Sequence, residues 1–253
     1  MKLLAEAVTR FTTEALVIKE MNVGENDRLV TLFSKEHGII KAFASGAKGI
    51  KSKKGAATSL LTYGNFAIKN KNGSLRIYEA TPITMFFGAG DDIVVLTLAQ
   101  YFCELGLNFA VNGANNNEFL RLILNSLHFL TVEKRNPSLI KAITELRTAS
   151  IAGYTPNLIA CDNCGKFEDD LMFFNLDEGI ITCSECPRES NVIPIDRTML
   201  SAMRHIVYSE FKKIYNFEIP DDRAKRLSDL TSEYLTTQTD YRFKTLDFYN
   251  SLK

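Results

Sequence analysis

Short runs of alternating apolar and polar residues, separated by turn-forming residues, occupy positions 12–79 of the chain. Branched and aromatic side chains dominate these runs, which is typical of half-buried β-strands. The dipeptide Asn72-Gly73, between the last two runs, is a strong hairpin signal. The predicted strands cover residues 13–19, 28–33, 39–43, 60–68 and 75–78.

Five short strands with one long connection predict a small closed barrel of the oligonucleotide-binding (OB) type. An SH3-like barrel would give the same alternation, so periodicity alone leaves the choice between the two open. The segment from Lys41 to Lys54 holds five lysines around Gly46, Gly49 and Gly55. We expect a flexible basic loop there rather than a helix.

From Pro82 onward the apolar residues recur at helical spacing. Asp91-Asp92 and Asn136-Pro137 are typical helix-start signals. The first three predicted helices are apolar on almost every face, which indicates a buried core, and the last two are amphipathic. The predicted helices cover residues 91–109, 118–132, 136–151, 196–211 and 221–236.

Four of the five cysteines form two Cys-x-x-Cys pairs with 18 residues between them. This spacing is typical of a four-thiolate zinc site, because a two-residue separation lets one turn aim both sulfurs at a tetrahedral ion. Two disulfides or a redox-active dithiol are the rival interpretations. A closed four-cysteine site has no open position, so we expect one structural Zn²⁺ per chain. The predicted ligands are Cys161, Cys164, Cys183 and Cys186.

The predicted fold class is therefore α+β, an N-terminal five-stranded OB-type β-barrel followed by an α-helical domain that carries a four-cysteine zinc ribbon. We expect the basic barrel in residues 1–80, the helical domain in residues 81–253, and the zinc-binding insertion in residues 155–192. The fifth cysteine, Cys103, lies among apolar residues of the first predicted helix and is interpreted as a small buried hydrophobe.

Charge is distributed unevenly, although the formal net charge of the chain is +0. Residues 1–80 carry 13 Lys and Arg against 7 Asp and Glu, whereas residues 81–253 carry 17 against 23. No acidic residue occurs from Ile39 to Tyr78. A field of one sign indicates a surface for an anionic polymer, first of all a nucleic acid, and a merely solubilising surface is the alternative. The candidate contacts are Lys41, Lys48, Lys51, Lys53, Lys54, Lys69, Lys71 and Arg76.

No catalytic constellation stands out, and we expect a protein that is not an enzyme. The three histidines are scattered, and Gly46-Ala47-Lys48-Gly49 lacks the spacing of a phosphate-binding loop. Asp169-Asp170 is interpreted as a solvated turn. A metal-dependent hydrolase is disfavoured because all four expected ligands are thiolates. No segment has the length of a membrane span or the pattern of a signal peptide, so we expect a cytoplasmic protein.

The chain resembles the RecO family of bacterial recombination mediators over residues 12–250. The similarity is sharpest in the opening strand Ala15-Leu16-Val17-Ile18, the turn and strand from Gly24 to Phe33, and the loop from Gly46 to Ser52. RecO proteins show a similar Gly-Glu-x-Asp-Arg turn and a similar Gly-Ala-Lys/Arg-Gly loop, and some carry the cysteine motif. The segment Met1–Arg10 precedes the usual start of the family.

The resemblance implies a non-enzymatic, nucleoid-associated DNA-binding protein of the bacterial cytoplasm. It implies binding to single- and double-stranded DNA, annealing of complementary strands, and work with RecR to load RecA. It also implies docking of the C-terminal tail of the single-stranded-DNA-binding protein on the helical domain.

The lysines and Arg76 would then track phosphates, while aromatic residues would stack on bases. Phe43, Tyr63, Phe66 and Tyr78 are the stacking candidates, of which we expect about half to lie in the barrel core. Arg28 is equally well explained by a structural ion pair. The alternative function is a protein-interaction adaptor whose barrel is a scaffold without a direct DNA role.

Overall fold

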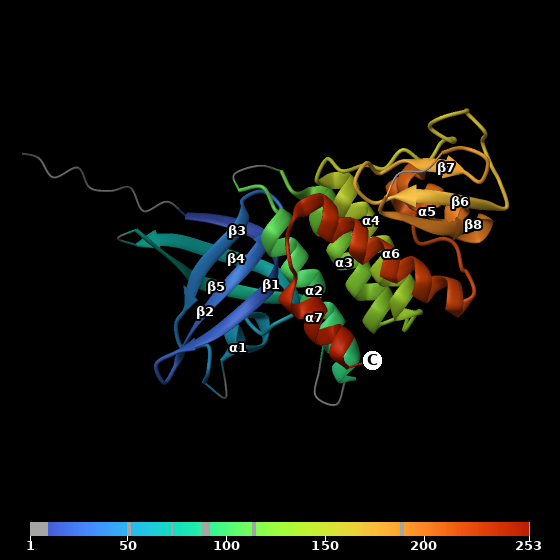
Figure 1. The fold of residues 1–253 in the computed structure, drawn as a ribbon. Helices are drawn as coiled ribbons and strands as arrows, with labels where there is room; N and C mark the ends of the chain where they lie inside the picture. Colours follow the sequence, from blue (N-terminus) through green and yellow to red (C-terminus); the bar gives the residue numbers. More distant parts are fainter. Residues whose placement is uncertain are drawn as a thin grey trace, which may run out of the picture. The chain divides into compact units, whose positions relative to one another are not determined.

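The computed structural model describes residues 10–49, 52–71, 73–87, 92–112, 115–187 and 190–252 (Figure 1). The chain divides into two compact units, the first reaching Val132 and the second running from Glu133 to Ser251. Two helices therefore group with the barrel, whereas the sequence places the division near residue 80. The predicted limits of the barrel domain, the helical domain and the 155–192 insertion stay predictions.

The first unit contains a closed five-stranded barrel with the strand order β1-β2-β3-β5-β4. All neighbouring strands are antiparallel except β3 and β5, which are parallel where Phe43 pairs with Arg76. Because β5 lies between β3 and β4, the chain follows the Greek-key path of an OB barrel, and the predicted fold class is confirmed. The strands are β1 (Arg10–Val23), β2 (Asp27–Ser34), β3 (Gly38–Ala44), β4 (Thr62–Lys71) and β5 (Ser74–Met85).

Alternation along the strands fills the barrel with small and branched side chains. Val17, Val30, Leu32, Phe66 and Ile68 are among the buried residues of this core. Strand β5 runs past Pro82, where the sequence predicts the change to helix. The register with β4 shifts between Tyr63 and Gly64, opposite Pro82. A proline is tolerated in a strand at such a bulge, which explains why the strand is longer than expected.

The predicted basic loop is partly helical, because α1 (Lys53–Ala57) forms within it. Ala57 of this short helix is buried in the barrel core, together with Ala47 from the preceding turn. The expectation of a loop without a helix is therefore wrong for these five residues. Burial of two alanines on the barrel stabilises a helix that glycine and lysine would not form alone.

Two helices complete the first unit, α2 (Ile93–Phe109) and α3 (Asn117–Thr131). Asp92 caps α2 as predicted, since its Oδ1 accepts the N–H of Val94 at 2.7 Å. Gly106 of α2 lies against the ring of Phe33 in β2, where an added Cβ would come within 3.1 Å of the ring. Cys103 is buried in α2, and burial raises the pKa of its thiol to about 12.

The second unit is built from α4 (Pro137–Ile151), α5 (Arg197–Tyr208), α6 (Asp221–Thr239) and α7 (Lys244–Ser251), with the 3₁₀ turn η1 (Phe211–Lys213) after α5. Asn136 caps α4 through the N–H groups of Ser138 and Leu139, as the Asn136-Pro137 signal predicts. The sequence did not predict α7, and it extended α5 into η1.

Helices α4 and α6 share a buried polar network that no pattern in the sequence indicated. The Nζ of Lys141 lies 3.1 Å from Glu145 Oε2 and donates to the carbonyl of Ser228 at 2.9 Å. Thr231 and Ser232 of α6 donate to the two carboxylate oxygens of Glu145. Both charges are thus paired and hydrogen-bonded, as buried charges must be.

A three-stranded sheet in the order β7-β6-β8 carries the cysteines. Its strands are β6 (Leu171–Asn175), β7 (Ile181–Cys183) and β8 (Val192–Asp196). The sequence predicts the first two as a ribbon and misses β8, which is short and contains Pro194. Among the described residues, no helix combines the length and the apolar character needed to cross a membrane.

Candidate metal centre and nucleic-acid interface

The four cysteine sulfurs of the two pairs converge in the second unit, where all lie within 4.8 Å of one another. Four thiolates about 2.3 Å from one tetrahedral ion would lie about 3.8 Å apart. The sulfurs of Cys164 and Cys183 are 3.7 Å apart, which fits a shared ion and is far longer than the roughly 2 Å of a disulfide. The donor set could therefore hold a metal ion and is compatible with zinc.

Backbone turns aim the sulfurs. Gly165 directly follows the first pair with φ +73°, a conformation that favours glycine, and its N–H donates to the carbonyl of Cys161 at 2.8 Å. The second pair begins at the end of β7, where the N–H of Cys183 points at the sulfur of Cys161 at 3.3 Å. The sheet thereby brings together two pairs that are distant in sequence.

The thiol pKa values diverge within the cluster. Burial acts to raise the pKa of Cys161, but backbone N–H groups of Cys183, Cys164 and Asn163 outweigh it and hold the pKa at about 6. Hydrogen bonding to the neighbouring thiols Cys164 and Cys183 raises the pKa of Cys186 to about 12. Crowded sulfurs cannot all carry charge without a cation among them, and metal binding would release the remaining protons.

Helix α5 fastens the segments on either side of the first cysteine pair to the helices of the second unit. The guanidinium of Arg204 donates to the carbonyls of Leu158, Ile159 and Phe167, and it stacks 4.1 Å from the centroid of the Phe167 ring. The side chain of Arg204 thus binds the segments immediately before and after the first cysteine pair.

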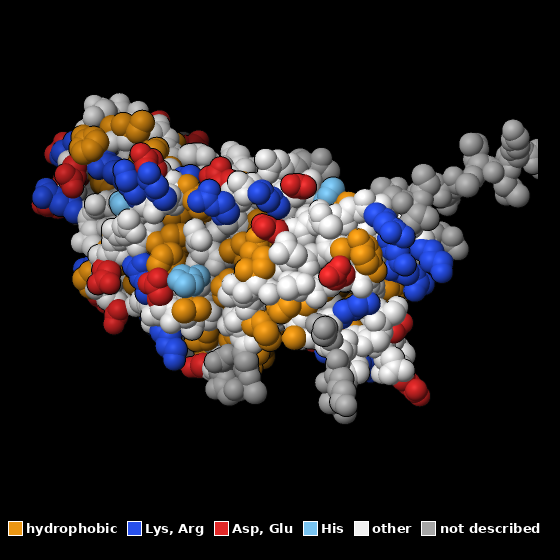
Figure 2. All heavy atoms as spheres, turned by 180° about the vertical axis from the view of Figure 1, so that it is seen from behind, with side chains coloured by type: hydrophobic (Ala, Val, Ile, Leu, Met, Phe, Trp, Pro, Cys, Tyr) orange, Lys and Arg blue, Asp and Glu red, His pale blue; other side chains and the backbone are white. Residues whose placement is uncertain are grey.

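A row of cations crosses the outer surface of the barrel. Arg10 of β1 pairs with Lys69 of β4, which pairs in turn with Arg76 of β5. Directly paired residues project from the same face of a sheet, and like charges placed opposite each other destabilise it. Among the residues that the structure describes, none of the three has an acidic partner. Figure 2 shows Lys and Arg side chains gathered over the hairpin of β4 and β5.

Aromatic rings lie within this cationic row. Arg76 stands 5.9 Å from the centroid of Phe43, its parallel neighbour in β3, and Arg10 stands 6.0 Å from the centroid of Tyr78. Tyr78 is 40% exposed and Phe43 is half-buried, so both rings can be reached from outside. Cations interleaved with aromatic rings are the usual surface for single-stranded nucleic acid.

The remaining stacking candidates are less suited. Phe66 is buried in the barrel core, so it is not available to a base. Tyr63 is half-buried, and its hydroxyl donates to Glu14 at 2.7 Å; burial and this bond raise its pKa. Of the four aromatic residues, Phe66 alone lies in the barrel core, which is fewer than the half expected there.

The predicted cations whose side chains the structure describes fall into three groups. Lys41, Lys69, Lys71 and Arg76 lie on the strands, with only Lys69 half-buried. Lys48 is exposed in the turn after β3. Lys54 is half-buried, and its Nζ lies 3.5 Å from the carbonyl of Ile77. Lys51 and the side chain of Lys53 lie outside the described part of the chain. Arg10 was missed because it precedes the acid-free stretch by almost thirty residues.

The turn from Gly24 to Arg28 is hydrogen-bonded to the basic loop. Asp27 accepts the N–H of Gly46 at 2.9 Å, and the carbonyl of Asn26 accepts the N–H of Lys48 at 3.1 Å. Arg28 pairs with Glu20 at 3.3 Å and donates to the carbonyl of Gly55 at 3.1 Å. The structural interpretation of Arg28 therefore has direct support, and the acidic turn positions the basic segment that follows β3.

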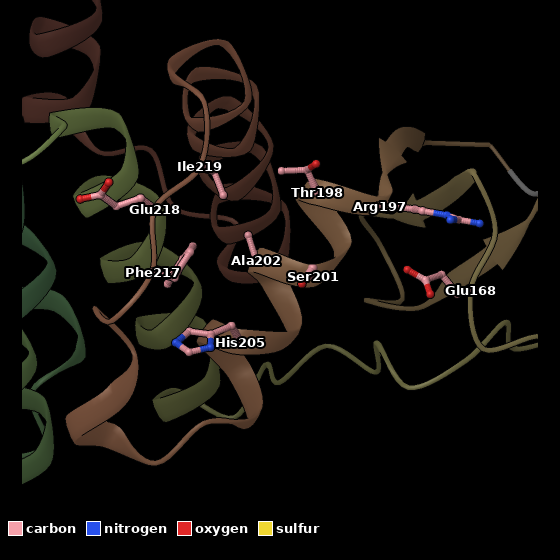
Figure 3. Close-up of a pocket in the computed structure, with 9 residues that line it drawn as sticks. All are labelled: Glu168, Arg197, Thr198, Ser201, Ala202, His205, Phe217, Glu218 and Ile219. Atoms are coloured by element: carbon pink, nitrogen blue, oxygen red, sulfur yellow. The ribbon is translucent and has the colours of Figure 1, made fainter.

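A hollow of about 450 Å³ lies along α5 in the second unit (Figure 3). Ala202 and His205 face Phe217, while Glu168 and Arg197 lie at the other end. The ring of His205 stacks 4.7 Å from Phe217, and its Nε2 lies 2.9 Å from the carbonyl of Lys213. With its histidine engaged in packing, this hollow shows no catalytic arrangement among the described residues.

Comparison with known proteins gives a consistent result across both units. The family model described as "Recombination protein O N terminal" matches residues 8–86, and the model described as "Recombination protein O C terminal" matches residues 90–247. The boundary between the two models falls between the barrel and α2.

Curated relatives match along almost the whole chain. A DNA repair protein RecO from Acetivibrio thermocellus is 30% identical over 241 residues, which cover 95% of this chain and 96% of the relative. The protein of the same name from Caldicellulosiruptor saccharolyticus is 26% identical over 240 residues, covering 95% and 98%. That from Bacillus mycoides is 24% identical over 240 residues, covering 94% and 96%.

Proposed function

The chain belongs to the recombination protein O family of DNA repair proteins, and from this premise we propose that it acts as a non-enzymatic mediator of recombination. In this proposal the barrel binds single- and double-stranded DNA without sequence preference and anneals complementary strands. RecR and RecA are the proposed partners in loading the recombinase, and the bacterial cytoplasm, at the nucleoid, is the proposed location.

The row of Arg10, Lys69 and Arg76 is the observation that carries the DNA-binding proposal. Three like charges in direct cross-strand register destabilise the barrel itself. Binding of an anionic ligand would explain why they are placed side by side. Phosphates would lie along this row, and bases would stack on Tyr78 and Phe43 beside it. Contacts of this kind are tolerant of sequence, as annealing of any complementary pair requires.

We propose further that Cys161, Cys164, Cys183 and Cys186 hold one Zn²⁺ with a structural role. The 3.7 Å between two of the sulfurs and the convergence of all four support this assignment. When bound, the ion would join the two cysteine pairs and stabilise a sheet too small to fold alone.

The helical unit is the proposed docking site for the C-terminal tail of the single-stranded-DNA-binding protein. That tail is acidic, so its site needs cations around an apolar floor. The hollow along α5 has a partly apolar floor, but Glu168 and Glu218 both line it. Two carboxylates disfavour an acidic ligand at this place, so the hollow itself is not proposed as the site for the tail.

Binding of a labelled single-stranded oligonucleotide, measured from low to physiological salt, tests the DNA-binding proposal. Contacts with about five phosphates give a log–log slope near −3.5. Joint replacement R10A, K69A and R76A removes three of these contacts, so we expect the slope to become shallower by about 2. A second variant, K51A with K53A and K54A, measures the share carried by the basic segment.

The matched control removes the same charge elsewhere. K212A with K213A and K225A takes three exposed lysines from the second unit and should leave the slope unchanged. If the triple variant R10A, K69A and R76A binds the oligonucleotide as the wild type does, the cationic row is not the DNA surface. Absence of binding at low salt would contradict direct DNA binding and favour the adaptor function, in which the barrel is a scaffold.

A further inference from the structure

Side chains other than those of the cysteines connect the two cysteine pairs. Asp169, five residues after the first pair, uses Oδ2 to accept the hydroxyl of Ser184 at 2.7 Å and the N–H of Ser184 at 3.3 Å. Ser184 lies inside the second pair, between Cys183 and Cys186. The carboxylate therefore fixes the turn that aims the second pair of sulfurs.

Lys166 completes the link from the other side. Its carbonyl accepts the N–H of Cys161 at 2.9 Å, which places its backbone within the first turn. Its Nζ reaches Asp169 at 3.2 Å and Glu185, within the second pair, at 3.2 Å. The first turn is thus tied to the second through one lysine and one carboxylate.

Burial distinguishes Asp169 from its neighbour Asp170. The side chain of Asp169 is 17% exposed, whereas that of Asp170 is 91% exposed and pairs with Arg197 at 3.1 Å. Exposed ion pairs contribute little, but a largely enclosed carboxylate with two bonds to one backbone turn restrains that turn. Asp170 is solvated, as the sequence suggests for both residues, whereas Asp169 is only partly exposed.

We propose that Asp169 is a positioning residue of the metal centre, which with Lys166 and Ser184 holds the two cysteine pairs at coordinating separation. The proposal rests on the assignment of these cysteines as zinc ligands. Groups that orient metal ligands without touching the metal are often important for binding. Their removal typically lowers metal affinity 10–100-fold. Asp169 acts on the sulfurs through the backbone of Ser184, to which it is hydrogen-bonded.

Zinc retention by the full chain tests the proposal. Purified wild type, D169A and D170A are titrated with a chelating dye, and the affinity and release rate of zinc are measured. We expect D169A, which removes the oxygen that accepts both bonds from Ser184, to lose zinc affinity 10–100-fold and D170A to match the wild type, although both variants lose one negative charge. Equal retention in D169A and wild type, or equal loss in D169A and D170A, would overturn the proposal.

Two further measurements separate positioning from general folding. S184A removes the 2.7 Å hydrogen bond and should weaken zinc retention, whereas S184T keeps the hydroxyl and should restore it. The absorption spectrum of the Co²⁺-loaded chain should show four-thiolate coordination in every variant. If D169A does not fold, S184A decides, and unimpaired retention in S184A overturns the proposal.

The outcome is independent of DNA binding. A wild-type chain that binds no zinc would refute the metal assignment and this proposal with it. A wild type that retains zinc, with D169A equally retentive, would refute only the positioning role. The salt dependence of oligonucleotide binding, measured on the same preparations, reports separately on the barrel.

Discussion

The barrel surface and the cysteine ribbon, defined as residues 155–192, arrange their charges in opposite ways. On the barrel, Arg10, Lys69 and Arg76 stand side by side without acidic partners among the described residues. In the ribbon, Lys166 is paired with both Asp169 and Glu185. Charges that form ion pairs within the chain stabilise its structure. Like charges that lie side by side without such partners are better explained by binding of an oppositely charged ligand.

The same contrast extends to the helical core. Lys141 and Glu145 are fully enclosed between α4 and α6, where each bonds to the other and to groups of α6. Removal of an ion-paired charge should therefore lower the stability of the fold, whereas removal of an unpaired surface charge should weaken DNA binding. The following experiments test this division.

The largest effect is expected from loss of a metal ligand. Replacement C183S should abolish zinc binding and unfold the ribbon, because apparent binding energies of structural zinc are about 10–16 kcal/mol. Metal content by elemental analysis and cleavage by a protease within residues 155–192 measure the change. C103A is the control, since Cys103 lies in α2 of the first unit and should leave one zinc per chain. Retention of zinc by C183S would contradict the four-cysteine site.

A smaller loss of stability is expected in the helical core. K141M alone leaves the carboxylate of Glu145 buried without its cation, which should cost about 3–5 kcal/mol. The double replacement K141M with E145L removes both charges and should recover most of that loss. Urea unfolding followed by circular dichroism gives both values. A double variant as unstable as the single one would show that the pair itself stabilises the fold.

The smallest effect is expected from one exposed ring on the barrel. Y78A should weaken binding of a single-stranded oligonucleotide by about 1–3 kcal/mol, because base stacking on the ring is lost. Duplex binding should change less, since paired bases do not offer their faces. I83A removes an exposed apolar side chain from the same strand and serves as the control. Equal effects of Y78A and I83A would exclude a specific stacking role.

The features best predicted from the sequence are those in which local chemistry fixes local structure. The cysteine spacing predicted a cluster that the fold assembles, because each pair needs only one turn. Asp92 and Asn136 marked the starts of α2 and α4, since a cap acts on the next few backbone groups. Alternating residues likewise predicted the five strands of the barrel.

Features that depend on distant partners were missed. The position of Arg10 in the cationic row follows from the register between β1 and β4, which no short window reveals. Lys141 and Glu145 are charged residues at the centre of a core, and their mutual ion pair together with hydroxyl and carbonyl groups of α6 makes that burial tolerable. Pro82 was read as the end of the β region because a bulge in the pairing with β4 was not foreseeable.

The seam between β3 and β5 has a consequence for how the barrel opens. Strands β4 and β5 pair from Thr62–Met85 to Lys71–Ser74, whereas β3 and β5 meet only around Phe43 and Arg76. The shortest ladder of a closed barrel is the first to separate in partial unfolding, so amide hydrogens there should exchange fastest. A strand of DNA bound across Phe43 and Arg76 would contact both β3 and β5. Binding would therefore stabilise their short pairing and slow the local unfolding of the barrel.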